Sequence, residues 1–346
     1  MNRPLPYLVI CATLAVFFAA CAKPPVTIDR AKLASFSPLS EPPAATAPES
    51  SARIDLGRML YYEARLSSSQ EISCNTCHPL ARYGADGKPS SEGHGGQRET
   101  RNSPSVYNAA LQFVQFWDGR APDVEAQAGR PLLNPVEMAM PSEAAVVHVL
   151  KSIPEYVTAF RKAYPRDRQP VTFANAAKAI GAFERGLITP SRWDRYLKGD
   201  DAALTATEKA GFNSFLEAGC AACHAGTLLG GSGFQKLGMA RNYPRTSDAG
   251  RFEITHNEAD RLVFKVPSLR NVAMTGPYFH DGKVPTLEDA LSLMAQYQTA
   301  RPLSFAETNA IVSWLRALTG DLPAEYIKPP PLPPSTAETP KPVDGD

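Results

Sequence analysis

Two pairs of cysteines in this sequence are each followed at once by a histidine. The first motif consists of Cys74, Cys77 and His78, and the second of Cys220, Cys223 and His224. In this C-x-x-C-H spacing, two thiols can add to the vinyl groups of one porphyrin, and the adjacent imidazole then reaches the iron. A single copy also fits a zinc site or a disulfide. Two copies on one chain favour two covalent c-type haems, with His78 and His224 as proximal iron ligands.

The first twenty residues have the pattern of an export signal. Arg3 precedes an apolar run from Leu8 to Ala20, which is too short to be read as a membrane span. We therefore read residues 1–20 as a signal peptide and expect a periplasmic protein. The residues before Cys21 resemble a bacterial lipobox, although Phe18 stands where leucine is usual. Acylation of Cys21 would anchor the protein to a membrane, and ordinary cleavage with a spare thiol is the alternative.

The cysteine count and the charge balance exclude some classes of protein. Cys11 is lost with the signal and Cys21 stands at the processing point, so no pair is left for a structural disulfide once four cysteines hold haem. Without Arg3, the 36 basic residues become 35, which equals the 35 acidic residues. A neutral polypeptide of this kind gives no indication of a nucleic-acid partner.

Segments rich in proline and alanine flank the expected folded body. Residues 21–50 read as a tether and residues 323–346 as an extended tail. Between them, apolar residues recur mainly at helical spacing, so we predict an all-α fold. The predicted helices cover residues 54–62, 144–150, 173–187, 205–218, 286–298 and 304–318. We expect two cytochrome c-like domains, residues 51–195 and 196–322, with one haem each.

Several blocks outside the two motifs closely resemble the bacterial dihaem cytochrome c peroxidase family. These blocks are residues 66–68, 101–104, 116–121, 134–138, 182–185, 264–271 and 277–282. In that family, one haem reacts with hydrogen peroxide and the other receives electrons from a small donor protein. The resemblance implies an enzyme that reduces hydrogen peroxide to water with electrons from a small cytochrome c or cupredoxin.

For the first haem, the resemblance implies a second iron ligand and two distal polar residues. The second ligand is His94, which lies in a glycine-rich segment that would let its imidazole leave the iron before peroxide binds. An exposed loop histidine is the alternative reading. Met138 and Met140 are competing axial candidates, but the family pattern places their segment at the peroxide pocket. There, Glu137 matches the acid–base residue and Gln127 matches the amide that positions peroxide.

For the second haem, a thioether opposite His224 would raise the potential and make this haem the electron entry point. Met239, Met274 and Met294 are the available methionines, and the family pattern selects Met294. In related MauG-like enzymes, which oxidise a partner protein, a tyrosine occupies that place. Tyr297 is close in sequence and keeps this alternative open. A non-catalytic dihaem electron carrier is a third reading, in which the distal polar residues would be dispensable.

The resemblance also implies contacts between the two haem units. Trp117 matches an aromatic residue between the haems and is a candidate electron relay, although a buried indole can also simply pack an interface. The family places Ca²⁺ at this interface, and its ligands match the side chain of Asn102 and the backbone carbonyls of Thr275 and Pro277. Oxygen donors of this kind suit Ca²⁺. Because the family is commonly dimeric, we also expect a homodimer.

Overall fold

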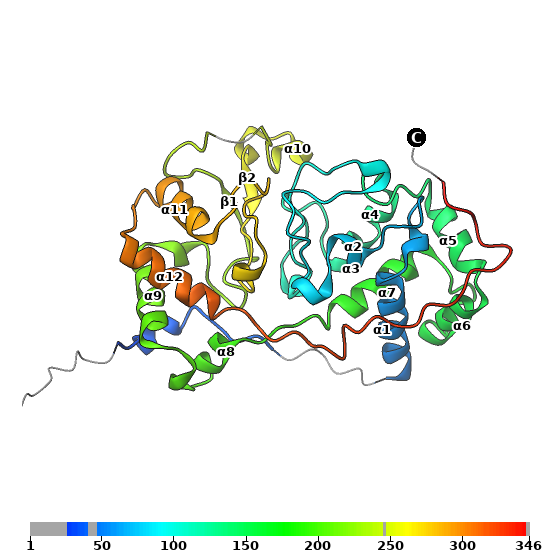
Figure 1. Cartoon of the computed structure of the whole chain (residues 1–346), viewed down its shortest axis with the longest axis horizontal. Helices are drawn as coiled ribbons and strands as arrows, with labels where there is room; N and C mark the ends of the chain where they lie inside the picture. The colour runs from blue at the N-terminus through cyan, green and yellow to red at the C-terminus, as the bar shows by residue number, and fades with distance from the viewer. Residues whose placement is uncertain (1–25, 41–46, 245–246, 344–346) are drawn as a thin grey trace, which may run out of the picture.

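The computed structural model describes residues 26–40, 47–244 and 247–343, which form two helical lobes (Figure 1). The helices of the first lobe are α1 (Pro48–Tyr61), α2 (Cys74–Cys77), α3 (Val124–Ala128), α4 (Arg130–Leu133), α5 (Glu143–Lys151), α6 (Pro154–Ala163) and α7 (Phe173–Glu184). The second lobe contains α8 (Arg192–Leu197), α9 (Ala206–Glu217), α10 (Phe252–Thr255), α11 (Leu287–Tyr297) and α12 (Phe305–Arg316), with strands β1 (Phe234–Lys236) and β2 (Val263–Lys265).

The core of the first lobe forms where α1 packs against α7. The side chain of Thr172 caps α7 by accepting a hydrogen bond from the backbone N of Asn175 at 3.1 Å. Gly57 brings the two helices close together, because a Cβ there would lie 1.8 Å from the carbonyl oxygen of Ala179. Leucines of α1 and aromatic residues of α7 fill the space around this contact. The close packing holds α7 beside the first C-x-x-C-H motif.

The core of the second lobe forms where α9 packs against α12. Gly211 provides the close approach here, because a Cβ would lie 1.9 Å from the carbonyl oxygen of Ala310. The rings of Trp193, Phe212 and Trp314 pack against one another, with centroids 4.8 to 5.5 Å apart. Aromatic pairs at these separations add to the free energy of burial. Each lobe therefore has its own core and contains one C-x-x-C-H motif.

The prediction of a predominantly helical fold is confirmed, with one exception. The six predicted helices correspond to α1, α5, α7, α9, α11 and α12. The exception is the short antiparallel pair β1 and β2, in which Phe234 lies opposite Lys265. Helices α2, α3, α4, α6, α8 and α10 were not predicted. Helix α1 also starts earlier than expected, because Pro48 stands at its first turn, where proline needs no N–H partner.

The segment expected as a tether is packed in its described part. Ile28, Leu33 and Phe36 are buried in the core of the second lobe. The backbone N of Leu39 donates to the carboxylate of Asp194 at 2.7 Å. Residues 26–40 therefore form part of the second lobe, because their apolar side chains pack into its core. The composition of this segment resembles that of a linker and does not reveal this packing.

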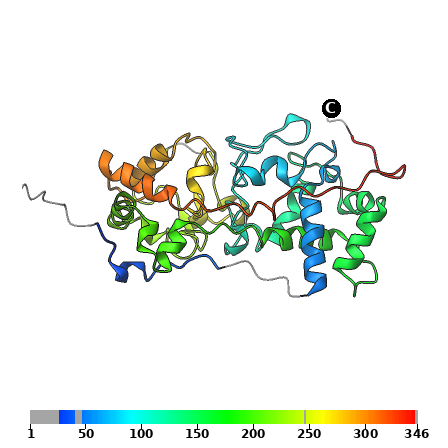
Figure 2. The same ribbon diagram turned by 60° about the horizontal axis from the view of Figure 1, so that its bottom comes forward.

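The expected C-terminal tail is extended but also packed. It leaves the second lobe after α12 and runs along the first lobe past α7 and α1 (Figures 1 and 2). The ring of Tyr326 stacks on Phe183 with 5.1 Å between centroids, and Ile327 is buried in the first core. The boundary between the cores also differs from the expected 195/196, because Trp193 of α8 already belongs to the second core.

The expected signal peptide and the lipid-anchor residue Cys21 lie outside the described residues. Within the ranges that are described, no helix is long and apolar enough to cross a membrane.

Candidate functional site

Each C-x-x-C-H motif forms one helical turn that ends near its histidine. In α2, the backbone N of His78 donates to the carbonyl oxygen of Cys74 at 2.9 Å. In the second motif, the 3₁₀ turn η7 (Cys220–Ala222) is followed by His224, whose backbone N donates to the carbonyl oxygen of Cys220 at 3.0 Å. The two thiols and the imidazole of each motif are thus brought together by local hydrogen bonds, as attachment of one porphyrin requires.

Each motif histidine forms a hydrogen bond with a backbone carbonyl through one of its ring nitrogens. The Nδ1 atom of His78 lies 3.2 Å from the carbonyl oxygen of Gly84, and the Nδ1 atom of His224 lies 3.0 Å from that of Leu229. A carbonyl accepts only from N–H, so these bonds place the proton on Nδ1 and leave the lone pair on Nε2. Burial lowers the pKa of both imidazoles, which keeps them neutral. Both residues therefore fit the form that binds haem iron.

The described part of the structure shows no set of zinc ligands at these cysteine pairs. Across the described residues, no group of three or more His, Cys, Asp or Glu side chains is placed to hold a metal ion. The four motif cysteines are free thiols rather than disulfides.

A cavity of about 410 Å³ opens beside the first motif. His78 lines it, together with Gln127 and Glu137, the two predicted distal residues. Gln127 lies on α3, which Asp123 caps by accepting a hydrogen bond from the backbone N of Ala126 at 2.7 Å. The structure thus brings three of the predicted site residues, which come from three separate segments, to one cavity.

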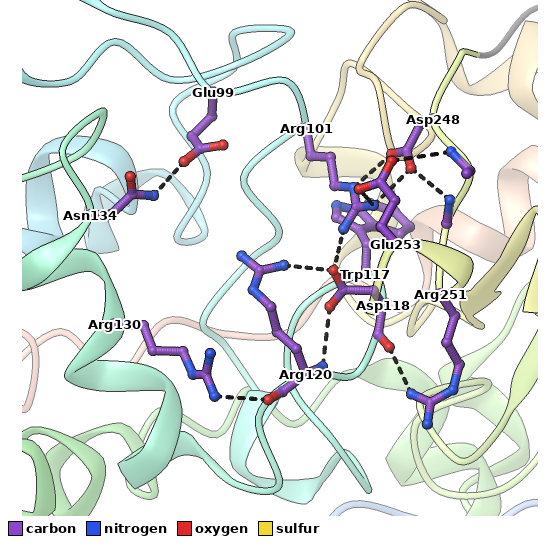
Figure 3. A network of polar contacts seen from close by, with 12 residues as sticks. Glu99, Arg101, Trp117, Asp118, Arg120, Arg130, Asn134, Asp248, Arg251 and Glu253 are labelled. Carbon is purple, nitrogen blue, oxygen red and sulfur yellow. Dashed lines mark hydrogen bonds and ion pairs between the residues drawn. The ribbon is translucent and has the colours of Figure 1, made fainter. Parts of the chain in front are cut away.

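The carboxyl group of Glu137 has a polar neighbourhood that shifts its proton affinity. The Nδ2 atom of Asn134 donates to Glu137 at 2.8 Å and to Glu99 at 2.5 Å, so one amide bridges two carboxyl groups. The Asn134–Glu99 bond is drawn in Figure 3. Burial and the charge of Glu99 raise the pKa of Glu137 to about 7. A carboxyl group that titrates in this range can both accept and return a proton near neutral pH.

The segment of His94 lies against the segment of Glu137. The backbone N of His94 donates to the carbonyl oxygen of Glu137 at 2.8 Å, and a Cβ on Gly93 would lie 2.0 Å from the carbonyl oxygen of Val136. Gly93 lines the first cavity, whereas His94 does not. The His94 Nδ1 atom is buried and has no hydrogen-bond partner among the described residues. The structure therefore does not bring this imidazole to the cavity, and its iron ligation stays a prediction.

A second cavity, of about 120 Å³, is lined by all three predicted calcium ligands, Asn102, Thr275 and Pro277. The Nδ2 atom of Asn102 donates to the carbonyl oxygen of Lys88 at 3.0 Å, which leaves its Oδ1 atom as an acceptor. These oxygens fit the donor preference of Ca²⁺, and occupancy by calcium stays a prediction.

Trp117 lines both cavities. Its Nε1 atom donates to the backbone carbonyl of Asn102 at 2.9 Å, and its own carbonyl accepts from the backbone N of Lys265 at 2.7 Å. The indole is therefore held between a loop of the first lobe and a strand of the second. Its role as an electron relay stays a prediction.

Met294 lies elsewhere than in these two cavities. It packs against the hydrophobic cluster formed by Leu237, Tyr243 and Phe264, and so does Tyr297. The candidate methionine ligand and the candidate tyrosine ligand thus share one cluster. The structure does not choose between them, and the ligand opposite His224 stays a prediction.

A network of charged groups beside Trp117 connects the two lobes (Figure 3). Arg101 donates to Asp118 at 2.5 Å within the first lobe, and to Asp248 at 2.6 Å and Glu253 at 3.1 Å in the second. Asp118 is nearly fully buried, so its bond with Arg101 is weakly screened by solvent. Sequence reasoning did not identify this network, because its first-lobe members lie more than a hundred residues from its second-lobe members and share no pattern with them.

Two further residues of the first cavity were also missed. Glu184 on α7 lines the cavity with only 4 % of its surface exposed, and burial raises its pKa to about 8. Lys265 lines both cavities with 5 % of its surface exposed. In the sequence, each of these charged residues stands within an apolar stretch, and this feature could have identified both as buried site residues.

Comparison with known proteins adds an independent result. Residues 51–202 match the family model described as di-haem cytochrome c peroxidase. The chain is 46% identical to cytochrome c551 peroxidase of Pseudomonas aeruginosa over 86% of each chain. It is 44% identical to cytochrome c551 peroxidase of Nitrosomonas europaea, over 87% of this chain and 89% of that one. A solved MauG-like protein associated with microbial copper homeostasis has a similar fold, with a TM-score of 0.75 and 28% identity, over 84% of this chain and 97% of that one.

Proposed function

The chain belongs to the di-haem cytochrome c peroxidase family, and we propose from this premise which of its residues serve the reduction of hydrogen peroxide. The enzyme is a cytochrome c peroxidase, which consumes one peroxide, two protons and two electrons to form two waters. When bound, haem c supplies an iron that activates peroxide and a route for single electrons. In our proposal, Cys74, Cys77 and His78 hold the peroxidatic haem, and Cys220, Cys223 and His224 hold the electron-transfer haem.

Glu137 is the proposed acid–base residue. The observation that carries this role is that Glu137 and Gln127 line the same cavity as His78. Glu137 would accept a proton from one oxygen of the peroxide and return it to the other oxygen as that oxygen leaves, while the Gln127 amide would orient the peroxide by hydrogen bonding. The pKa of Glu137, raised to about 7, suits both halves of this transfer.

Trp117 is the proposed relay for electrons between the haems, because it lines the cavity of His78 and its carbonyl accepts a hydrogen bond from β2 of the second lobe. Calcium is proposed to bind Asn102, Thr275 and Pro277, with water completing its shell. Since Trp117 donates to the carbonyl of Asn102, a bound cation would also hold the relay in place. Three protein ligands without a carboxylate are expected to give modest affinity.

His94 is proposed as a second ligand of the first iron in the fully oxidised enzyme. Its segment contains Gly95 and Gly96, both with positive φ, so the backbone can take conformations that other residues disfavour. Departure of the imidazole would open the iron to peroxide. Met294 is proposed as the ligand opposite His224, and the donor as a small cytochrome c or cupredoxin. We also propose export to the periplasm, lipid anchoring at Cys21 and a homodimer.

The decisive experiment is peroxide-dependent oxidation of a reduced small cytochrome c. Fully oxidised enzyme is compared with enzyme that carries one added electron and Ca²⁺, and turnover in the second form alone is expected. Replacing Glu137 by Gln should abolish turnover with both haems retained, whereas replacing the exposed Glu143 by Gln should not. Full activity of the Glu137→Gln variant would remove the acid–base assignment. Equal turnover of both enzyme forms would show that departure of His94 after reduction is not required.

A MauG-like protein oxidase is the second candidate, and one observation favours it. Tyr297 packs against the same hydrophobic cluster as Met294, so a tyrosine lies in the same cluster as the candidate methionine ligand. The ligand can be read from the wild-type spectrum, because a methionine ligand produces a sulfur-to-iron charge-transfer band and a tyrosinate does not. Loss of this band in Met294→Ala, with retention in Tyr297→Phe, would support the peroxidase assignment.

A further inference from the structure

Lys265 occupies the place where the two cavities meet. It is the last residue of β2, and its backbone N donates to the carbonyl oxygen of Trp117 at 2.7 Å. Its side chain lines both cavities, although only 5 % of the residue is exposed. The residue is therefore held next to the candidate relay and borders the candidate site of the first haem, whose cavity it shares with Cys77 and His78.

This ammonium group has no carboxylate partner of its own. Its Nζ atom donates to the side-chain oxygen of Gln112, a neutral amide. Within the described ranges, the structure gives it no salt bridge, and the carboxylate that acts on it at longer range is Asp118. Asp118 already pairs with Arg101 at 2.5 Å and Arg120 at 2.9 Å. A buried charge without a counterion costs several kcal/mol, and burial accordingly lowers the pKa of Lys265 to about 8.

The other cations near this junction have partners. Arg101 pairs with Asp118, Asp248 and Glu253, and the buried Arg270, which lines the second cavity, pairs with Asp194 at 2.6 Å. Of these three cations, Lys265 alone lacks a carboxylate partner. It is therefore the one available to bind an anion that enters either cavity. Haem c carries two propionates, which are anions fixed to the edge of the porphyrin.

We propose that the Lys265 ammonium binds a haem propionate where the two cavities meet and thereby raises the reduction potential of that haem. The inference rests on the proposed attachment of haem at both C-x-x-C-H turns. A positive charge near a haem favours the ferrous form, because reduction adds one negative charge to the iron site. Since Lys265 lines the first cavity together with His78, a propionate of the first haem is the expected partner.

The test measures the midpoint potentials of both haems in the purified dihaem protein by spectroelectrochemical titration. Lys265→Met removes the charge at similar length, and Lys265→Arg keeps it. Lys236→Met is the matched control, because this lysine is exposed on the paired strand β1. For Lys265→Met, we expect one haem to become about tenfold harder to reduce, which corresponds to about 59 mV for one electron. Lys265→Arg and Lys236→Met should leave both potentials near their wild-type values.

The haem whose midpoint potential shifts in Lys265→Met is the one whose propionate binds Lys265. Unchanged potentials in a folded Lys265→Met protein would overturn the inference, as would an equal shift in Lys265→Arg, because the effect would then depend on shape rather than charge. If Lys265→Met retains only one haem, full content in Lys265→Arg supports the inference, and loss in both variants overturns it. Failure of the proposed function is seen separately, as wild-type protein that lacks two haems or peroxide turnover.

Discussion

The backbone N of His94 donates a hydrogen bond to the carbonyl oxygen of Glu137, with 2.8 Å between the two atoms. The candidate ligand that must leave the iron and the candidate acid–base residue are thus joined through their main chains. Movement of the His94 segment would either break this bond or shift the segment of Glu137. Opening of the iron and alignment of the acid–base residue are therefore expected to be coupled.

Replacing Gly93 by Ala should disturb this junction, because the added Cβ would lie 2.0 Å from the carbonyl oxygen of Val136. The two segments must separate to accommodate the methyl group, so we expect at least a tenfold loss of kcat with normal haem content. Steady-state peroxide turnover checks this. Gly233→Ala is the control, since nothing lies within 4 Å of a Cβ there. Equal activities of the two variants would show that the junction is not needed.

The pH dependence of turnover should follow the titration of Glu137. Its pKa is raised to about 7, and only the carboxylate form can accept a proton from peroxide. Activity should therefore fall as the pH drops below about 7. Glu99→Gln removes a neighbouring negative charge, which lowers the pKa of Glu137, so activity should persist to lower pH. A pH–rate profile of each protein tests this, and an acid limb that stays in place in Glu99→Gln would contradict it.

The buried Glu184 should make stability depend on pH. Its pKa is raised to about 8, mainly by burial, so the folded state holds a proton that the unfolded state loses above about pH 4.5. Unfolding free energy should thus decline by up to about 1.4 kcal/mol per pH unit between these values. Glu184→Gln should lack this contribution. Denaturation at several pH values compares the two proteins, and parallel pH profiles would show that Glu184 is ionised in the folded state.

Sequence reasoning located the parts of the site that short-range chemistry defines. Haem attachment requires the spacing of Cys74, Cys77 and His78, and each predicted helix shows its apolar spacing within one segment. The contacts of Glu99 with Asn134 and of Arg101 with Asp248 depend on how loops pack, and loop packing leaves no periodic pattern. A proline-rich composition predicts an extended tail at residues 323–346. It does not reveal what that tail packs against.

The buried ion pair of Arg270 and Asp194 should be essential for the second lobe. The two groups lie 2.6 Å apart with almost no exposure, and Asp194 also accepts from the backbone N of Leu39. Arg270→Met leaves a buried carboxylate without its cation, which typically costs about 3–5 kcal/mol. Guanidinium denaturation measures this loss. The double variant with Asp194→Asn should recover part of it, and a single variant as stable as wild type would show that the ion pair is not needed for stability.

The C-terminal tail is expected to stabilise the first lobe, although it follows the last helix of the second. The ring of Tyr326 stacks on Phe183, and its hydroxyl donates to the backbone carbonyl oxygen of Phe183 at 2.7 Å. Because Tyr326 is only partly buried, Tyr326→Ala should cost about 2–3 kcal/mol, less than a fully buried aromatic residue. Leu332→Ala, further along the tail and more exposed, should cost below about 1 kcal/mol. Thermal denaturation distinguishes the two variants, and similar small losses in both would mean that the tail lies on the lobe without stabilising it.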